Sequence, residues 1–384
     1  MQLVAYGAQD IYLTGNPQIT FFKVVYRRHT NFAVESIEQT FNGSADFDKK
    51  FSCTISRNGD LLHRVYLELD LGVTNNDSAT ASVASNLGFN LINYVEVEIG
   101  GQCIDKHYGE WMTIWTDLTH GGDAATLLDK MTSVPAITSG SVTSNKLYIP
   151  LQFWFCRNPG LALPLIALQY HEVKLNVLFN NSSSVNIKDV NDNVLSSVIT
   201  IDNCCVFCDY IFLDTDERRR FAQVSHEYLI EQVQFSNALN AGTVTQGSSG
   251  TTQAELRFNH PVKELVWNIG NSDENLVVDD ALLQLNGHDR FKSRAGSYFT
   301  DVQRYQHHTG EGVSGLYSHI YSFALKPEEH QPSGTCNFSR IDNAVLNLSF
   351  SGAQGGGSHT LKVYAVNYNV LRIMSGMGGL AYSN

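Results

Sequence analysis

The stretch Val65-Tyr66-Leu67-Glu68-Leu69-Asp70-Leu71 alternates apolar and polar side chains, with positions 65, 67, 69 and 71 apolar. The same alternation recurs at residues 94–99, 171–179, 346–350 and 361–366. Successive side chains of an extended strand point to opposite faces, so this pattern buries one face of a sheet and leaves the other polar. Many such strands, separated by Gly, Asn and Ser, predict an all-β protein built of antiparallel sandwiches or barrels.

Two segments have helical spacing instead. In residues 106–118 the large apolar side chains recur every three or four positions. In residues 214–223, Asp214 is placed to cap a helix, with Glu217 three residues further on, as in a capping box. Three arginines, Arg218 to Arg220, follow these acids and suit the helix dipole.

The two halves of the chain repeat one order of elements. Residues 94–105 (YVEVEIGGQCID) and residues 280–291 (DALLQLNGHDRF) both resemble a strand that runs into a tight turn, at Gly101 and Gly287. Each is followed by a short aromatic, helix-like stretch, then by a strand, a proline-containing loop and another strand. This repetition predicts two similar β domains, joined by the helix at 214–223.

Composition points towards assembly. The chain has 384 residues, which at about 150 residues per domain corresponds to roughly two or three domains. Its 26 basic and 38 acidic residues give a net charge of −12, which argues against direct contact with nucleic acid. Only 17% of residues are charged, while 43% are hydrophobic. A polar but weakly charged surface is easily buried against partner proteins.

The sequence also bears on cellular compartment. The amino terminus lacks a basic run followed by an apolar core, so we expect no signal peptide. The longest strongly apolar stretch, residues 161–168, is too short to span a bilayer and contains Pro164. The seven cysteines lie mostly in strand-like runs, and we interpret them as buried free thiols in a reducing compartment.

No catalytic, cofactor or metal site is predicted. Cys204, Cys205 and Cys208 lack the paired spacing of a four-ligand zinc site. His307 and His308, with Glu311 nearby, are adjacent rather than in the His-x-His spacing of cupin metal sites, and we interpret them as loop or interface residues. The polar run 328–330 (EEH) is interpreted as a solvated loop. Nucleophile-elbow and phosphate-loop motifs do not occur.

Several stretches, taken in order, resemble the major capsid protein of nucleocytoplasmic large DNA viruses. They are residues 15–32 (GNPQITFFKVVYRRHTNF), 97–102 (VEIGGQ), 104–109 (IDKHYG), 213–222 (LDTDERRRFA) and 367–382 (NYNVLRIMSGMGGLAY). The resemblance covers the whole chain and implies two tandem eight-stranded antiparallel jelly rolls joined by a short helical linker. We expect an N-terminal arm at 1–27, the first jelly roll at 28–213, the linker helix at 214–224, and the second jelly roll with a C-terminal tail at 225–384.

The same resemblance implies a structural protein without catalysis or cofactors. It implies homotrimeric, pseudo-hexagonal capsomers that tile the icosahedral shell of a large double-stranded DNA virus. The implied partners are neighbouring capsomers and the minor capsid and penton proteins. Contact with an internal membrane is expected at most through minor proteins or the N-terminal arm. The implied location is the virion shell, with assembly in the host cytoplasm.

The arm is the predicted assembly element. We expect residues 1 to about 27 to lie at the base of the shell, turned at Gly15-Asn16-Pro17. The predicted assembly residues are Phe21, Phe22, Val24, Val25, Arg27 and Arg28. The alternative is that this segment forms the ordinary first strand of the first domain. The arginines at 27–28 and 218–220 could form a nucleic-acid patch, but intramolecular salt bridges on a linker helix are the favoured interpretation.

Two other functions stay open at the level of sequence. A minor capsid or penton-like paralogue would share the fold and differ in its copy number in the virion. A two-domain β-sandwich enzyme or lectin acting on glycans would need a cleft with paired carboxylates or a metal ion. The sequence shows no compelling pair of this kind.

Overall fold

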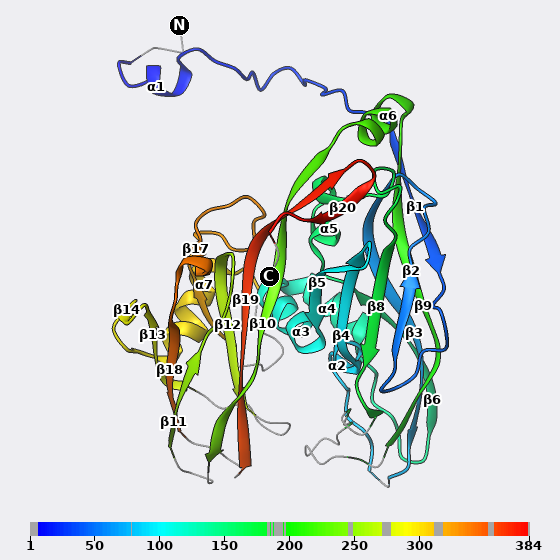
Figure 1. The fold of residues 1–384 in the computed structure, drawn as a ribbon, viewed down its shortest axis with the longest axis vertical. Coiled ribbons are helices and arrows are strands. Elements are labelled where there is room, and N and C mark those ends of the chain that lie inside the picture. The colour runs from blue at the N-terminus through cyan, green and yellow to red at the C-terminus, as the bar shows by residue number, and fades with distance from the viewer. Residues whose placement is uncertain are drawn as a thin grey trace, which may run out of the picture.

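Two β-sandwiches stand side by side in the computed structural model, and a long N-terminal arm leaves one end of the molecule (Figure 1). The structure describes residues 7–382 except 78, 183–184, 186, 188–194, 196, 245–248, 271–277, 311–317 and 352–356. Among these residues no helix is long and apolar enough to cross a lipid bilayer.

The first sandwich consists of two antiparallel sheets. Sheet I has the strand order β1 (Phe32–Gln39), β9 (Ser197–Leu213), β3 (Leu61–Asn75), β6 (Val142–Pro150), with β7 (Leu163–Pro164) added on β3. Sheet II has the order β2 (Lys50–Thr54), β8 (Val173–Phe179), β4 (Ile92–Ile99), β5 (Gln102–Tyr108).

The second sandwich is built in the same way. Sheet III has the order β10 (His226–Val244), β19 (Gly357–Met374), β12 (Pro261–Gly270), β16 (His319–Ser322), with β17 (Cys336–Asn337) on β12 and β20 (Met377–Leu380) on β19. Sheet IV has the order β11 (Gly250–Glu255), β18 (Ala344–Phe350), β13 (Val278–Leu285), β14 (His288–Asp289), with β15 (Arg294–Ala295) on β13.

The two sandwiches share one topology. When the principal strands of each are counted in chain order, without the short β7, β15, β17 and β20, both follow the order 1-8-3-6 in one sheet and 2-7-4-5 in the other. This is the jelly-roll arrangement, and it confirms the two tandem eight-stranded rolls. The repeated turns are confirmed as well, since Gly101 and Gly287 have φ values of +87° and +76°, which glycine adopts without strain.

Helices connect the strands. The longer ones are α3 (Gly109–Thr119), α4 (Gly122–Thr132) and α6 (Thr215–Gln223). The others are α1 (Ile11–Thr14), α2 (Leu87–Leu91), α5 (Trp154–Arg157), α7 (Gln303–His307), the π-helical turn η3 (Tyr298–Val302) and the 3-10 turns η1 (Pro159–Leu161) and η4 (Phe338–Arg340). In α6 the carboxylate of Asp214 accepts a hydrogen bond from the Thr215 N–H, so the predicted cap is present. Arg218 pairs with Asp60 at 3.0 Å, which is one of the expected intramolecular salt bridges.

The predicted helix at 106–118 was wrong at its start. Lys106 and Tyr108 continue β5, where they pair with Glu96 and Tyr94 of β4. The helix begins only at Gly109, where a Cβ atom would lie 2.2 Å from the carbonyl oxygens of Phe89 and Ile92. Sheet pairing, which is not visible in the helical spacing, therefore takes the first three residues of the segment.

Each sandwich encloses its own apolar core. The inward side chains of β3, such as Leu67, Leu69 and Leu71, are fully buried, as the alternation predicts. A second core, around Trp267 and Phe299, fills the other sandwich. All seven cysteines carry free thiols, and six of them are buried or partly buried, whereas Cys103 on β5 is exposed, so the expectation of a buried thiol is wrong at that position. Burial in the first core raises the pKa of the Cys53 thiol to about 11.

Candidate assembly surfaces

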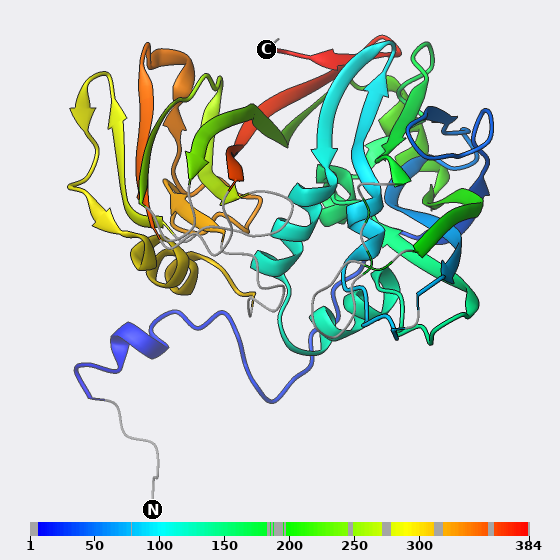
Figure 2. The ribbon, with the colours of Figure 1, turned by 90° about the horizontal axis from the view of Figure 1, so that it is seen from below.

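The helix α3 lies between the two sandwiches (Figures 1 and 2). Its large apolar side chains recur at spacings of three and four and contact the outer face of sheet III. The residues that form this third core are Trp111, Ile114, Trp115, Leu118, Val266, Ile320, Tyr364 and Val366. We call the four side chains from α3 the α3 wedge. Because these large side chains are buried between the two sandwiches, their contact holds the sandwiches in one relative orientation.

Polar contacts extend this interface along the strands. Asp105 on β5 accepts a hydrogen bond from the backbone N–H of Val233 on β10 at 3.1 Å. Lys362 on β19 forms an ion pair with Glu110 at the start of α3, with 2.5 Å between Nζ and Oε2. Directional contacts of this kind fix the register of one sandwich against the other.

A buried ionic network also crosses the interface. The Glu231 carboxylate lies 2.9 Å from Nζ of Lys263 and accepts a hydrogen bond from the Arg157 guanidinium at 3.1 Å. Nδ1 of His330 lies 3.3 Å from the same carboxylate. Lys263 is fully buried and also donates to the Pro327 carbonyl at 2.7 Å. Arg157 belongs to the first sandwich and the other members belong to the second. Burial alone would raise the pKa of Glu231, but His330, Lys263 and Arg157 lower it to about 2.

His308 forms a second buried cluster. Its imidazole lies between Glu264, 3.0 Å from Nε2, and Glu328, 3.1 Å from Nδ1. Burial would lower the pKa of His308, but the carboxylates of Glu264 and Glu328 outweigh it and raise the pKa to about 9. The imidazole is therefore charged at neutral pH.

The loop that carries His308 is tied to the carboxyl end of α3. The Gly310 N–H donates to the Leu118 carbonyl at 2.8 Å, and Arg304 pairs with Asp117 at 3.0 Å. His308 thus lies at an interface, as the sequence suggested, whereas Glu311 lies outside the described residues. The solvated-loop interpretation was wrong for Glu328, which binds His308, and for His330, which lies in the Glu231 network, whereas Glu329 is exposed.

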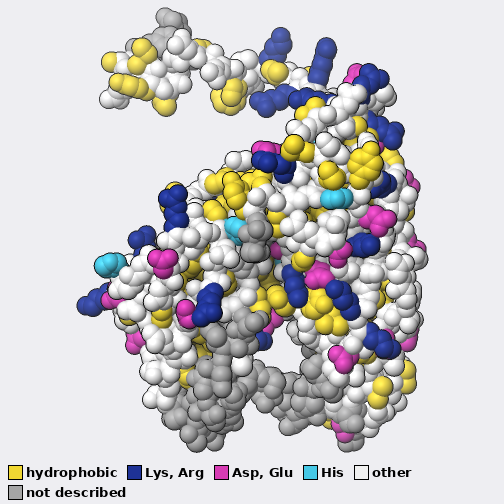
Figure 3. Space-filling model, in the orientation of Figure 1, with side chains coloured by type: hydrophobic (Ala, Val, Ile, Leu, Met, Phe, Trp, Pro, Cys, Tyr) yellow, Lys and Arg dark blue, Asp and Glu magenta, His cyan; other side chains and the backbone are white. Residues whose placement is uncertain are grey.

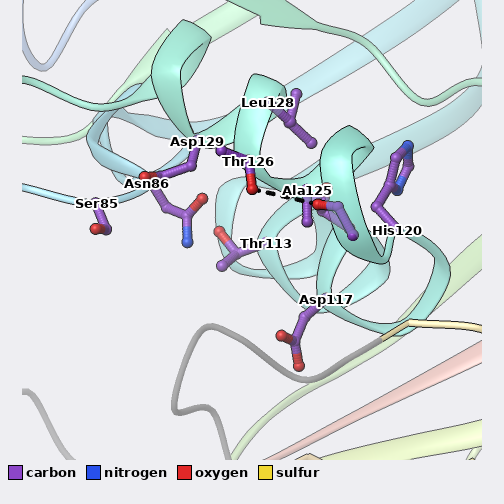
Figure 4. A pocket seen from close by; sticks show the side chains of 11 residues that line it. Ser85, Asn86, Thr113, Asp117, His120, Ala125, Thr126, Leu128 and Asp129 are labelled. Atoms are coloured by element: carbon purple, nitrogen blue, oxygen red, sulfur yellow. Dashed lines mark hydrogen bonds between the residues drawn. The ribbon is translucent and has the colours of Figure 1, made fainter.

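A hollow of about 210 Å³ lies between α3 and α4 (Figure 4). Its labelled lining includes Asn86, Thr113, Asp117, His120 and Asp129. Asp117 is already paired with Arg304, and burial lowers the pKa of His120. Within the described part of the chain, no group of three or more His, Cys, Asp or Glu side chains is arranged to hold a metal ion.

The arm is separated from both sandwiches. It leaves β1 beside α6 and runs away from the body of the molecule (Figure 1). The side chains of Phe21 and Phe22 are 93% and 99% exposed, and Val24, Val25, Arg27 and Arg28 are exposed as well. Figure 3 shows Lys and Arg side chains gathered where the arm joins the body. The first strand begins at Phe32, so the alternative in which this segment is an ordinary first strand was wrong.

Comparison with known proteins shows which protein family has this sequence and architecture. Residues 20–214 match the family described as "Major capsid protein N-terminus", and residues 217–277 and 270–379 match "Large eukaryotic DNA virus major capsid protein". The major capsid protein of Pyramimonas orientalis virus is 54% identical, covering 100% of this chain and 99% of the relative. That of Paramecium bursaria Chlorella virus 1 is 47% identical with the same coverage.

Solved structures agree with these matches. The PBCV-1 virus capsid protein superimposes with a TM-score of 0.79 at 40% identity, covering 95% of this chain and 100% of that one. The Faustovirus major capsid protein, at 12% identity and a TM-score of 0.73, supports the fold alone.

Two matched jelly rolls held together by a helical wedge define a double jelly-roll capsid protein. The chain belongs to the family of large eukaryotic DNA virus major capsid proteins. It is a structural protein of the viral capsid.

The buried network gives a first prediction. Replacement Lys263→Met leaves the Glu231 carboxylate buried without its closest cation, so we expect a loss of about 3–5 kcal/mol in the free energy of unfolding. The matched control is Lys362→Met, whose ion pair with Glu110 is partly exposed and should contribute less than about 1 kcal/mol. Chemical denaturation measures both, and equal losses would contradict the proposed importance of the network.

The His308 cluster gives a second prediction, on pH. The pKa of His308 is higher in the folded chain, about 9, than the ordinary value of 6.5. Its stabilisation is therefore complete below pH 6.5 and is lost as the pH rises through 9. We expect the thermal unfolding midpoint to fall over this range, and His308→Gln to remove that slope. His307→Gln, on the neighbouring histidine, should keep it; a slope that persists in His308→Gln excludes this origin.

Proposed function

We propose that three copies of the chain form a capsomer with a pseudo-hexagonal outline that tiles the icosahedral shell of a large double-stranded DNA virus. The observation that carries this proposal is the identical topology of two jelly rolls held side by side by the α3 wedge. Three such chains around an axis present six similar walls, so similar contacts can be made on every side.

The domain boundaries belong to the same proposal. Residues 1–27 act as the arm, 28–213 and 225–384 as the two jelly rolls, and 214–224 as the linker. The arm contacts neighbouring capsomers or minor proteins at the base of the shell. Its apolar side chains support this role, because an exposed apolar segment gains free energy when a partner buries it.

The remaining partners follow from the same role. The protein works by self-association and without catalysis, and it binds minor capsid and penton proteins at the edges of the tiled surface. The net charge of −12 supports the absence of direct contact with the genome. Contact with an internal membrane is indirect or through the arm, and assembly takes place in the host cytoplasm.

Electron microscopy and native mass spectrometry of the purified chain test the capsomer. We expect three-fold particles with a hexagonal outline and three times the mass of one chain. The capsomer proposal fails if the chain remains a two-lobed monomer at all concentrations and salt conditions.

The arm is tested by a set of serine substitutions. Replacement of Phe21, Phe22, Val24 and Val25 by Ser should leave the unfolding free energy within about 0.5 kcal/mol, because these side chains are exposed in the single chain. We expect the same variant to lose assembly into shells. Serine at Leu127 and Leu325, which are exposed apolar side chains outside the arm, is the matched control and should assemble. Normal assembly of the first variant would exclude the arm as an assembly element.

A further inference from the structure

The second sandwich carries a counterpart of the α3 wedge. In both sandwiches a helical segment follows the fifth principal strand and begins near a tightly packed glycine. A Cβ atom on Gly109 would lie 2.2 Å from the carbonyl oxygen of Ile92, and one on Gly296 would lie 1.7 Å from that of Val278. Ile92 and Val278 begin the fourth principal strands, β4 and β13, so the two glycines occupy equivalent positions.

The two helical segments differ in what covers them. Three residues after each glycine, Met112 and Phe299 are fully buried in the core of their own sandwich. The outward side of α3 is buried by sheet III, whereas the outward side of η3 and α7 carries Val302 and Tyr305, which are 41% and 89% exposed. We call these two side chains the second wedge.

The first sandwich carries a counterpart of the face that receives α3. The first two residues of β3 pair with β7, and the first two residues of β12 pair with β17. Directly after these residues, the register shifts in the pairing of β3 with β9 and in the pairing of β12 with β19. This shared register makes Tyr66 equivalent to Val266. Val266 lies opposite Tyr364 and Ile320, and Tyr66 lies opposite Phe207 and Pro150.

This second face is uncovered in the single chain. Val266, Ile320 and Tyr364 are fully buried beneath α3, but Tyr66, Phe207 and Pro150 are only half-buried. The rings of Tyr66 and Phe207 stack with 5.3 Å between their centroids. A hollow of about 590 Å³ extends from Tyr66 and Pro150 towards Trp115 of α3 and Glu328 of the second sandwich in the same chain. We call Tyr66, Phe207 and Pro150 the receiving face.

Charge complementarity favours a contact between the second wedge and the receiving face. Asp301 is exposed beside Val302, and Arg64 is exposed beside Tyr66. In the internal contact the position of Arg64 is occupied by Glu264, which is buried and bound to His308. Asp301 beside the second wedge can therefore pair with Arg64 beside the free face, whereas in the internal contact the position of Asp301 is taken by the apolar Ile114.

We propose that Val302 and Tyr305 of one copy pack on Tyr66, Phe207 and Pro150 of the next copy, in the way that α3 packs on sheet III within each chain. This inference rests on the proposed trimer and names the surfaces that close it. Each chain has one free wedge and one free face, so the contact is heterologous and runs head to tail. Three copies with two jelly rolls each close a ring of six similar walls.

Two variants test the proposal in the full chain, with native mass spectrometry to determine the assembly state. Tyr305→Arg and Tyr66→Arg should each weaken association by about 30-fold or more, as loss of a central aromatic contact does. Tyr170→Arg is the matched control, because Tyr170 is 76% exposed but lies outside both surfaces. An unchanged far-UV circular dichroism spectrum and a cooperative unfolding transition show that the variants are folded. Tyr305 is 89% exposed, so the test with Tyr305→Arg holds even if Tyr66→Arg disturbs the fold.

Mixing the two variants sharpens the test. One variant keeps its face and the other keeps its wedge, so an equimolar mixture should give heterodimers and no trimers. Trimeric Tyr305→Arg protein, or a mixture without heterodimers, overturns the proposed interface while the trimer itself stands. A wild-type chain that is monomeric under every condition overturns both the interface and the capsomer.

Discussion

The burial of the α3 wedge against sheet III is the interaction on which the rest of the molecule depends. Two jelly rolls joined only by a short linker would move independently, because few contacts would cross between them. The side chains of Trp111 and Trp115 fill the space between the sandwiches with closely packed apolar atoms. A rigid pair of walls is what a repeating shell requires, since each small change in their angle would accumulate over many copies.

The buried ion pairs fix the position of one sandwich relative to the other across this apolar contact. Apolar burial alone does not fix register, whereas the Glu231 carboxylate has ligands from both sandwiches at set distances. Burying charge has a desolvation cost, and such networks often contribute little net stability. Their value here lies in geometry: Arg157 of one sandwich reaches Glu231 only in one arrangement of the two.

The surfaces that remain apolar in a single copy lie where the proposed assembly would cover them. Phe21 and Phe22 lie on the arm, and Tyr305 lies on the second wedge. A monomeric soluble protein seldom leaves such side chains grouped in the open. The low fraction of charged residues also favours assembly, because few charges need to be desolvated when neighbouring copies meet.

The sequence by itself determined the strands and the cap at Asp214, because each depends on residues close together in the chain. It also determined the duplication, because both halves carry the same local patterns in the same order. The alternation at 65–71 needs only the two faces of a strand, and the turns at Gly101 and Gly287 need only a residue that tolerates positive φ. The start of α3 and the partners of His308 and Glu231 were decided by tertiary structure alone. Glu264 lies 44 residues from His308, and His330 lies 99 residues from Glu231, so no local pattern could pair them. The fold of the second jelly roll brings these side chains together, and Arg157 of the first jelly roll reaches Glu231 only when the two jelly rolls have packed on each other.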